Sequence, residues 1–560
     1  MKYILGIDTG GTYTDGVIIS SKNNNILAKS KAFTTHDNLA EGIFNCINEL
    51  DFENMSLIDE VHLSTTVAVN AVLESNFEKI GLLQIDRNVE GKVPAGYRYM
   101  MRLPFSYDKC LIDRNMQEFK DIRKVFMNNV NHIIVTTPTS KYSTDTELRI
   151  AHIIEKELGI KCTSASHICN DDNYYERTVT AILNVFLIPI VEEWISGIKK
   201  VMNKFGIRGE ITMVNACGNL ISCEEAINNP LKTVFSGLAA SVRGGIALTQ
   251  EKDFLLIDMG GTSSDITRII NNEQRRLNQY AKIDEFSIKE ETINVKSYGI
   301  GGDSYIKARQ DGEFVIGPEK AIPLCIASKK YPQLIEEIAT YEAATNYEML
   351  TAQSVDCYIG IKGAHINGLN PAEALTARYL IDNPHNIFYI AEHFGKDPDA
   401  LHMDRLIKQK AVRLISLTPT DILHAEGSFV KWDNTISSIA VKKMSKEMKI
   451  NSKEFIKKVK MQITNSLSKV CMQGIAAFED VEFDFNECPG AAFLLERYFN
   501  DDNTLIRTEF NINNPIVAIG APAGAWMQQV ADKMGTKVII PEHGEVANAF
   551  GAAIAEKIQV

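Results

Sequence analysis

Apolar residues in the first 35 positions occur in three short runs separated by turn residues. The runs are Tyr3–Thr9, Asp15–Ser20 and Ile26–Thr34, with Gly10-Gly11 and Asn23-Asn24-Asn25 between them. Short apolar runs joined by glycine or asparagine turns are typical of antiparallel strands. This part of the chain is therefore predicted to be a β-meander.

Strand and helix patterns alternate after the meander. Asp37 is an N-cap type of residue, and a helix is predicted from it to about Leu50. Such alternation is typical of the α/β class. Further strands are predicted at Val61–Ser64 and His132–Thr136, and further helices at Thr65–Glu74 and Thr144–Leu158.

The second half is predicted to contain a helical insertion, Ala321 to about Val470, followed by a return to strands. Within the insertion, Lys442–Leu467 is a lysine-rich amphipathic stretch that we interpret as a solvated helix face. The predicted C-terminal elements are a strand Pro515–Ile519, a turn Gly520–Gly524, a helix from about Ala525 to Met534, a strand Val538–Pro541 and a helix Ala547–Ile558.

An internal repeat relates two segments 250 residues apart. Leu5–Ile19 (LGIDTGGTYTDGVII) and Leu255–Ile269 (LLIDMGGTSSDITRI) are identical at eight of fifteen positions. In both copies an apolar strand ends in Asp, turns on Gly-Gly-Thr and enters a second strand. The repeat predicts two duplicated lobes.

The repeated turn has the residue types of a phosphate cradle. Glycines let the backbone approach a ligand closely, and exposed turn N–H groups with a threonine hydroxyl bind anions. A carboxylate at the strand end can hold hydrated Mg²⁺ against phosphate oxygens. The alternative, a plain hairpin turn, explains one copy better than it explains two matched copies. We predict that Asp8 and Asp258 are catalytic and hold the metal, and that the phosphates contact Gly10, Gly11, Thr12, Gly260, Gly261 and Thr262.

Two further glycine-rich turns are weaker candidates. Gly520, Ala521 and Gly524 precede a predicted helix and leave room for a flat ring, so we assign them to the adenosine side. The loop Ser297–Ser304 also precedes a predicted helix, and its Gly301 and Gly302 either touch phosphate or simply connect the lobe. The Asp residues of the second hairpin strands, Asp15 and Asp265, are expected to brace the hairpins. The chain contains neither the P-loop signature nor the Rossmann fingerprint.

The amino-acid composition argues against one class of binding partner. The 560 residues are 45% hydrophobic and 23% charged, with a net charge of -12. This balance argues against nucleic acid as the main partner, because DNA and RNA require a basic surface. The most apolar stretch, Ala181–Val191, is read as too short to cross a membrane, and the N-terminus is not read as a signal peptide.

The cysteines and histidines indicate a reducing compartment and no transition-metal site. Ten cysteines are scattered without any C-x-x-C pair, and the eleven histidines show no H-x-x-x-H spacing. Cys217 is interpreted as a small packed thiol. We expect a cytoplasmic protein.

Taken in order, the motifs resemble the hydantoinase A/5-oxoprolinase family, which includes N-methylhydantoinase A, 5-oxoprolinase and the acetone carboxylase β subunit. The resemblance extends over most of the chain. The segments that carry it are Asp8–Asp15, Ser64–Glu74, Tyr175–Asn184, Asn215–Leu220, Ser236-Gly237, Asp258–Asp265 and Leu417–Asp421.

The resemblance implies a fold, a domain division and a chemistry. The expected fold is α/β, with duplicated actin/sugar-kinase-like (ribonuclease H-like) lobes around an ATP cleft. The expected domains are residues 1–172 and 173–560, with a nucleotide-side segment at about 510–560. The expected cofactors are ATP and Mg²⁺. The expected reaction is ATP-dependent opening of a cyclic amide of the hydantoin or 5-oxoproline type, in an oligomer that can need a second catalytic subunit.

Other functions stay open at this stage. They are a β-type subunit of an ATP-dependent ketone carboxylase and a nucleotide-driven chaperone or reactivase of the same superfold. The substrate-side candidates implied by the family segments are Asn70, Glu74, Glu176 and Arg177, although the last two can equally be a buried structural pair.

Three departures from the family pattern concern the organic substrate more than the ATP site. Residues 81–106 do not reproduce the family segment, Asp303 stands where the family has glycine, and the chain is shorter than the long members.

Overall fold

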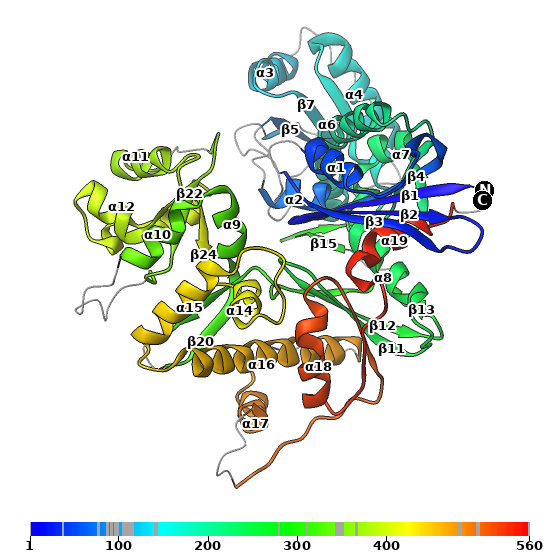
Figure 1. The fold of residues 1–560 in the computed structure, drawn as a ribbon. Helices are drawn as coiled ribbons and strands as arrows, with labels where there is room; N and C mark the ends of the chain where they lie inside the picture. Colours follow the sequence, from blue (N-terminus) through cyan, green and yellow to red (C-terminus); the bar gives the residue numbers. More distant parts are fainter. Residues whose placement is uncertain are drawn as a thin grey trace. The chain divides into compact units, whose positions relative to one another are not determined.

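The computed structural model forms two compact units, which are described separately (Figure 1). Unit 1 consists of Met1–Gln250, Asn272–Asn294 and Val546–Val560, and unit 2 of Glu251–Asn271 and Val295–Glu545. The structure describes residues 2–35, 39–74, 79–85, 89, 93, 100–103, 117–138, 144–277, 281–283, 285–309, 312–341, 352–364, 368–479, 481, 484–485, 487–499 and 505–557.

Unit 1 is built on a six-stranded sheet with the order β10-β9-β4-β1-β2-β3. The strands β1, β2 and β3 form the predicted antiparallel meander, and β4 and β9 continue the sheet in parallel with β1. Their bounds are β1 Tyr3–Thr9, β2 Tyr13–Ser20, β3 Ile26–Phe33, β4 Ile58–Thr65, β9 Glu210–Val214 and β10 Leu220–Ser222.

A second sheet of unit 1 contains four parallel strands in the order β6-β5-β7-β8. They are β5 Ile80–Ile85, β6 Met100–Leu103, β7 His132–Thr136 and β8 Lys161–Ser164. The predictions for β7 and for α4 (Thr144–Leu158) are confirmed residue for residue. The remaining helices of unit 1 are α1 Leu39–Asn48, α2 Val67–Glu74, α3 Gln117–Phe126, α5 Ala165–Ile168, α6 Tyr174–Lys204, α7 Cys223–Asn228, α8 Ser236–Ala247 and α19 Ala547–Ala553.

Helix α6 is the main core helix of unit 1. Among the described residues it is the one helix long and apolar enough, by length and composition, to cross a membrane, so Ala181–Val191 belongs to a longer apolar element than predicted. However, 56% of its most apolar window is buried within the fold. Its Trp194 and Ile198 pack in one hydrophobic cluster with Leu5 of β1 and Val61 of β4. This packing is that of a core helix.

Helices α8 and α19 cross with their backbones in contact. A Cβ placed on Gly244 would lie 2.0 Å from the carbonyl oxygen of Ala547, and one on Gly551 would lie 1.8 Å from that of Ala240. Glycine is therefore the one residue type that fits at either position. The crossing ties the last helix of the chain to unit 1.

Unit 2 repeats the topology of the first meander. β11 (Phe254–Met259) and β12 (Ser264–Ile270) are antiparallel, β12 pairs with β18 (Lys296–Tyr298), and β11 is followed in parallel by β25 (Ile516–Ile519) and β26 (Val538–Ile539). Asp258 opposes Asp265 across the hairpin, just as Asp8 opposes Asp15 in unit 1. The duplication of the hairpins is thus a feature of the structure.

The insertion contains a sheet that the sequence analysis did not predict. Its strands have the order β21-β24-β22-β23, and β22 is antiparallel to β24. Each strand has two to five residues, so none produced a clear pattern of period two against the surrounding helices. They are β21 Ile322–Pro323, β22 Cys357–Gly360, β23 His385–Asn386 and β24 Val412–Ser416.

Helices form the rest of the insertion and the C-terminal part of unit 2. The lysine-rich stretch is two helices, because Lys449 has a φ of 56° and ends the first of them. The helices are α9 Leu324–Lys330, α10 Gln333–Thr340, α11 Pro371–Tyr379, α12 Ile387–Phe394, α13 Met403–Lys408, α14 Pro419–Glu426, α15 Thr435–Glu447, α16 Ser452–Phe478, α17 Pro489–Phe499 and α18 Ala523–Lys533.

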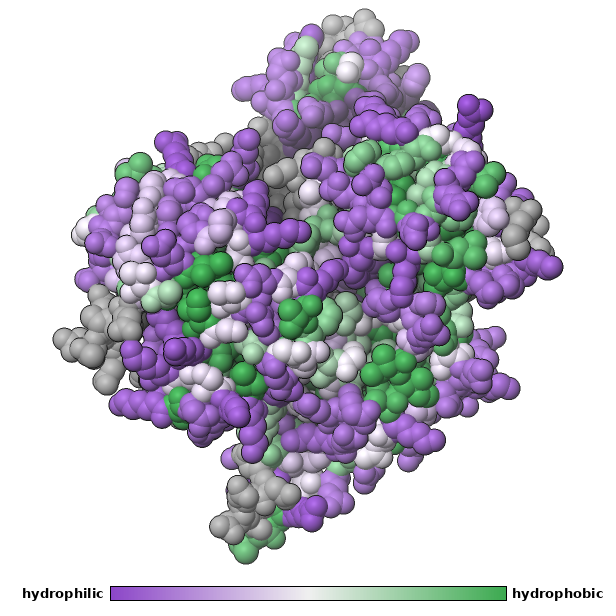
Figure 2. Space-filling view, in the orientation of Figure 1, coloured by the Kyte–Doolittle hydropathy of each residue, from purple (hydrophilic) through white to green (hydrophobic). Residues whose placement is uncertain are grey.

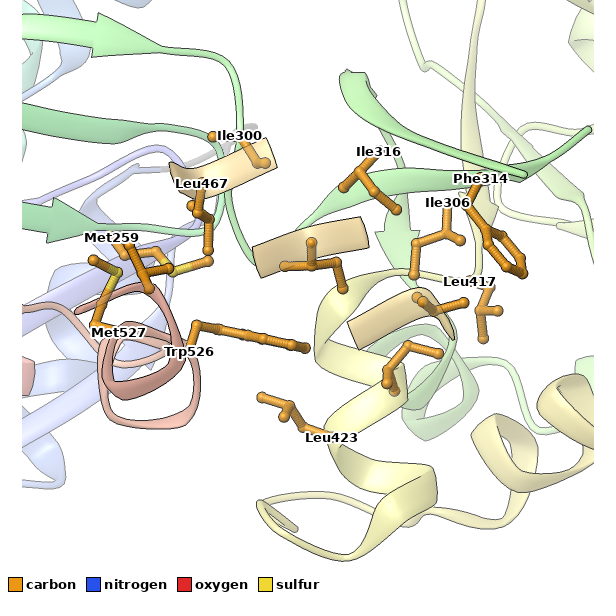
Figure 3. Close-up of a cluster of buried hydrophobic side chains, with 14 of the residues drawn as sticks. Met259, Ile300, Ile306, Phe314, Ile316, Leu417, Leu423, Leu467, Trp526 and Met527 are labelled. Atoms are coloured by element: carbon orange, nitrogen blue, oxygen red, sulfur yellow. The ribbon is translucent and has the colours of Figure 1, made fainter. Parts of the chain in front are cut away.

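The core of unit 2 joins the repeated sheet to these helices. Trp526 and Met527 of α18 pack with Met259 of β11, Leu467 of α16 and Leu423 of α14 (Figure 3). Trp526 is fully buried. The sheet end that carries Asp258 is therefore supported by three helices from distant parts of the chain.

The prediction of a helix after the glycine-rich loop is wrong. The glycine-rich loop Ser297–Ser304 is followed by a strand, β19 (Ser304–Ala308), which pairs with β20 (Phe314–Lys320), and not by a helix. The predicted domain boundary at 172/173 falls inside unit 1, immediately before α6, because α6 packs into the core of the first meander. The predicted C-terminal segment, about 510–560, contributes to both units.

The surface agrees with the charged composition. Hydrophilic residues cover most of the face drawn in Figure 2, and hydrophobic residues occur there in separate small groups.

Candidate phosphate-binding hairpins

The β1–β2 turn places a buried carboxylate beside open main chain. Asp8 is 3% exposed, and its Oδ1 accepts a 2.6 Å hydrogen bond from the Ser64 hydroxyl at the end of β4. The Gly10 N–H closes the turn on the Tyr13 carbonyl oxygen at 2.9 Å. Among the described residues, the Gly11 N–H has no hydrogen-bond acceptor. Thr12 lies in the same turn and is half-buried.

The first turns of α8 and α19 both lie close to the Asp8 carboxylate. A Cβ on Gly237, in the first turn of α8, would lie 3.3 Å from Asp8 Oδ1. Asn548, in the first turn of α19, donates to Asp8 Oδ2 at 3.4 Å. Sequence reasoning missed Asn548, and it quoted Ser64 and Gly237 within family segments without giving either residue a role. A small residue after Ser236 was the available signal.

Asn70, a predicted substrate-side residue, lies beside the hairpin turn of unit 1. Its Nδ2 donates to the Thr66 hydroxyl at 3.3 Å and lies 3.9 Å from the Cβ position of Gly11. Glu74 ends α2, and its side chain lies outside the described part of the chain.

Glu176 and Arg177 lie at another place in unit 1, the carboxyl end of β7. Arg177 is fully buried and donates to the carbonyl oxygens of Thr137 and Asp171. Burial raises the pKa of Glu176. The contacts of Arg177 are main-chain contacts that hold the β7 end against α6, and the described residues show no ion pair between Arg177 and Glu176. The substrate-side role of both residues stays a prediction.

A buried carboxylate near this point organises the second sheet. Glu147 accepts hydrogen bonds from the main chain and hydroxyl of Thr137 and Ser166 and from the hydroxyl of Ser164. Five donors satisfy one buried charge, so Glu147 fixes the ends of β7 and β8.

The second hairpin presents the same groups. Asp258 is 8% exposed at the end of β11, and the Gly260 N–H donates to the Ser263 carbonyl oxygen at 2.9 Å. The N–H groups of Gly261 and Thr262 have no acceptor within the described residues. Both turns therefore leave main-chain donors open beside a buried carboxylate, which is the arrangement of an anion cradle.

The predicted glycine-rich loop lies directly on this hairpin. The Gly302 N–H donates to the Gly260 carbonyl oxygen at 3.0 Å, and the Asp303 N–H donates to that of Gly261 at 2.7 Å. A Cβ on Gly301 would lie 2.5 Å from the Gly261 carbonyl oxygen. Asp303 makes this contact through its main-chain N–H. An aspartate in place of the family glycine therefore preserves the hydrogen bond to Gly261.

The third turn also meets Asp258. Gly520 has a φ of +90°, and a Cβ there would lie 2.2 Å from the Met259 carbonyl oxygen and 2.8 Å from Asp258 Oδ1. Ala521 follows it, while a Cβ on Gly524 would have nothing within 4 Å. The structure thus brings Gly520 to the hairpin, while the assignment of the turn to the adenosine side stays a prediction.

The start of α14 also contacts the glycine-rich loop of unit 2, which the sequence did not predict. Thr420, at the start of α14, donates from its N–H and its hydroxyl to the Gly302 carbonyl oxygen at 3.1 and 2.9 Å. Its neighbour Asp421 is buried and caps α14. The family-like segment Leu417–Asp421 was noted in the sequence, but only the fold places it against Gly302.

The bracing residues differ between the two hairpins. Lys31 pairs with Asp15 at 2.6 Å across β2 and β3, whereas the residue opposite Asp265 on β18 is Ser297. Burial and the neighbouring Asp258 carboxylate raise the pKa of Asp265 to about 7, against the lowering effect of the Ser297 and Ser263 hydrogen bonds. The repeat is therefore symmetric in backbone but not in charge.

Lys320 clamps the glycine-rich loop of unit 2. Its ammonium donates to the Gly299 carbonyl oxygen at 2.8 Å and to the Ser304 hydroxyl at 3.0 Å. That hydroxyl in turn accepts from the Gly301 N–H at 2.9 Å. Burial lowers the pKa of Lys320 to about 8, although Asp303 acts in the opposite direction.

This lowered pKa predicts a pH-dependent stability. Between pH 8 and the ordinary lysine pKa, the Lys320 side chain is protonated in the unfolded chain and neutral in the folded chain. The free energy of unfolding therefore rises with pH in this range. We expect wild type to gain stability relative to Lys320→Met between pH 7.5 and 10, measured by urea unfolding. An equal pH response of Lys320→Met and wild type would contradict the prediction, and Lys329→Met is the control for an exposed neighbour.

The residues present fit magnesium better than a transition metal. The described residues contain no group of three His, Cys, Asp or Glu side chains that could hold a metal alone. Each hairpin offers one buried carboxylate beside open N–H groups. Magnesium is usually held by one or two carboxylates together with phosphate oxygens and water. In unit 1 the carboxylate that would hold magnesium is Asp8, and in unit 2 it is Asp258.

Comparison with known proteins identifies the family. Residues 4–91 match the family model for the hydantoinase/oxoprolinase N-terminal region, and residues 177–325 match the model for hydantoinase/oxoprolinase. The chain belongs to the hydantoinase/oxoprolinase family. The two matches contain both hairpins and the glycine-rich loop of unit 2.

Characterised relatives of the family are distant in sequence. Caprolactamase subunit alpha of Pseudomonas jessenii is 24% identical over 57% of this chain and 51% of its own length. Acetophenone carboxylase gamma subunit of Aromatoleum aromaticum is 24% identical over 57% and 49%. The chain therefore spans about half the length of these curated relatives.

Solved structures of the family share the fold. A nucleotide-free acetone carboxylase matches 99% of this chain and 70% of its own chain, with a TM-score of 0.65 and 15% identity. An ATP-dependent caprolactamase from Pseudomonas jessenii matches 99% and 71%, with a TM-score of 0.60 and 17% identity.

Proposed function

We propose that this protein is an ATP-dependent hydrolase that opens a cyclic amide. The observation that carries the proposal is the duplicated hairpin, in which a buried Asp stands beside Gly-Gly-Thr with open N–H groups in both units. The caprolactamase among the relatives supports the substrate class, because a caprolactam is a cyclic amide.

The chemistry follows from the poor reactivity of an amide carbonyl. Resonance makes a lactam carbon a weak electrophile. In the proposed reaction the carbonyl oxygen forms a bond to the γ-phosphorus as the bond to the ADP oxygen breaks. A first water then adds to the activated carbon, the ring C–N bond breaks and the nitrogen takes a proton, which leaves an acyl phosphate. A second water hydrolyses the acyl phosphate and releases phosphate. The products are an amino acid, ADP and phosphate.

The protein's part in these steps is to position the reactants and to stabilise charge. We assign the open N–H groups of Gly11, Gly261 and Thr262, with the Thr12 hydroxyl, to phosphate oxygens. Gly301, Gly302 and Thr420 hold the second hairpin in shape. Ser64 and Asn548 orient the Asp8 carboxylate. Bound magnesium would supply neutralisation of the phosphate charge.

The test is ATP hydrolysis by the purified full chain with Mg²⁺, alone and with each of 5-oxoproline, N-methylhydantoin, hydantoin and caprolactam. Stoichiometric release of phosphate and ring-opened amino acid with one of them supports the proposal. ATP binding without stimulation by any cyclic amide, also after addition of a candidate partner subunit, contradicts it and leaves the ketone carboxylase and the nucleotide-driven chaperone hypotheses.

A second candidate is a subunit of an ATP-dependent ketone carboxylase. It is favoured by the acetophenone carboxylase and acetone carboxylase subunits among the relatives and by the acetone carboxylase structure. Such an enzyme would phosphorylate an enolisable ketone and pass it to a partner subunit. ATP hydrolysis that needs both acetone or acetophenone and bicarbonate would select this function over ring opening.

A further inference from the structure

A cavity of about 410 Å³ in unit 1 is separate from the residues that surround Asp8. One side is formed by the face of α8 that carries Val242, Arg243 and Ile246. The loop between β9 and β10 forms another side with Cys217 and Gly218. The segment Asn272–Gln274 closes it.

The lining combines an aliphatic floor with opposite charges. Val242 and Ile246 supply the apolar surface, Arg243 supplies a cation and Glu273 an anion. Gly218 has a φ of +85°, which favours glycine, and its Cβ position lies in van der Waals contact with Arg243 Nε at 3.6 Å. A guanidinium binds a carboxylate with two parallel hydrogen bonds.

A buried acceptor in the same lining lacks a donor. The side-chain oxygen of Gln274 is buried and has no hydrogen-bond partner among the described residues. An amide oxygen without a donor is costly when buried, unless a ligand provides one. An ammonium group would satisfy both this oxygen and the Glu273 carboxylate.

We propose that this cavity binds a zwitterionic amino acid. Its carboxylate would contact Arg243, its ammonium group would contact Glu273 and Gln274, and its methylene groups would pack on Val242 and Ile246. The volume suits a ligand of this small size. Ring opening of a lactam produces such a molecule, so the lactam product is the natural ligand to test; that choice of amino acid rests on the proposed function, whereas the charge pattern does not.

Helix α8 joins the cavity to the hairpin of unit 1. Its 12 residues carry the cavity lining in the second half and the Asp8 contact in the first turn. Ser236 Oγ accepts from the Thr65 N–H at 3.1 Å and donates to the Thr65 carbonyl oxygen at 3.0 Å. An occupied cavity would therefore alter ATP turnover through α8.

The first experiment measures binding to the full chain by calorimetry. The probes are glutamate, 4-aminobutyrate and 6-aminohexanoate, with glutarate and butylamine as ligands that lack one charge. We expect at least one zwitterion to bind at least about tenfold more tightly than glutarate, which lacks the ammonium group, or butylamine, which lacks the carboxylate, since a hydrogen bond to a charged group contributes a factor of this order. Glutarate or butylamine binding as tightly as every zwitterion would overturn the proposal.

Substitutions in the cavity lining test whether the zwitterion binds in this cavity. Arg243→Met should weaken it at least about tenfold and Glu273→Gln by a smaller factor, while the exposed Arg149→Met should leave it unchanged. Glu273 is exposed and glutamine has the same shape, so this variant separates lost binding from lost folding. Binding that is unaffected by both cavity variants, or reduced equally by Arg149→Met, would contradict the site.

Alkylation of Cys217 gives a readout that needs no activity. Cys217 is half-buried in the lining, and its thiol donates to the Glu291 carbonyl oxygen at 3.3 Å. The bound zwitterion should slow its reaction with iodoacetamide, measured by peptide mass spectrometry, while exposed Cys488 reacts at an unchanged rate. Protection without ring-opening activity would overturn the proposed function alone. Ring opening without protection by any zwitterion would overturn the cavity proposal alone.

Discussion

Asp8→Asn should reduce the substrate-stimulated ATPase rate at least about 100-fold, the scale expected when one group that stabilises transition-state charge is removed. Asparagine keeps the size of the side chain and can still accept from the Ser64 hydroxyl, whose distance to Asp8 Oδ1 is 2.6 Å. What it loses is the negative charge available to a magnesium ion. The expected result is a fall in kcat with the fold intact, measured as phosphate release at saturating ATP and magnesium.

The matched control is Asp15→Asn in the same hairpin. Asp15 is paired with Lys31, so the loss of its charge leaves a partly buried lysine without its counter-ion and should lower stability. At a temperature where both variants are folded, Asp15→Asn should retain most of the wild-type kcat. A similar loss of kcat in both variants would mean that Asp8 acts through the shape of the hairpin.

Gly520→Ala should destabilise unit 2 by at least about 3 kcal/mol, because two separate penalties add. The φ of +90° is strained for a residue with a Cβ, at a cost of about 1–3 kcal/mol. The added carbon would also lie 2.2 Å from the Met259 carbonyl oxygen, so the strand end beside Asp258 would have to move. Thermal and urea unfolding, each followed by tryptophan fluorescence, would report the loss, since Trp526 lies in the core beside Met259.

Gly524→Ala is the control from the same turn. A Cβ at this position has nothing within 4 Å, and alanine is the better helix former, so stability should be unchanged or slightly raised. If the turn receives the adenosine part of ATP, this variant should nevertheless weaken ATP binding, measured by calorimetry. A Gly520→Ala protein as stable as wild type would show that the turn is free to rearrange.

The first meander and the two hairpins could be predicted because their signals are local. Asp8 and Asp258 each follow an apolar run and precede Gly-Gly-Thr, so sequence periodicity places them at strand ends. The register that sets Asp8 opposite Asp15 follows from the same short segment. Local patterns of this kind survive in the fold because the turn chemistry and the strand pattern agree.

Contacts between distant segments were not predictable in the same way. Asn548 reaches Asp8 across 540 positions, and Thr420 reaches Gly302 across 118. The sequence around Asn548 and Thr420 contains no local pattern that indicates a contact with a distant segment. The role of Glu176 and Arg177 was difficult to predict for another reason. The family segment identifies residues adjacent in sequence, but it does not reveal that Arg177 binds the carbonyl groups of Thr137 and Asp171 in the fold.

The short strands of the insertion show the limit of periodicity. His385 and Asn386 form a two-residue strand within a helical environment, and Asn386 also caps α12. Its side-chain amide donates to the carbonyl oxygens of Ser354 and Asp356, which fixes the strand from outside its own segment. Such a strand depends on tertiary contacts and has no signature of its own.

Unit 1 is assembled from three stretches of chain, and the last of them ends with the helix that crosses α8 at Gly244 and Gly551. A fragment cut after Gln250 would lack the helix that covers the backbone of α8 and the amide that contacts Asp8. The two units therefore cannot be produced as N-terminal and C-terminal halves. A C-terminus shortened to remove this helix would therefore impair the first hairpin, which lies at the opposite end of the sequence.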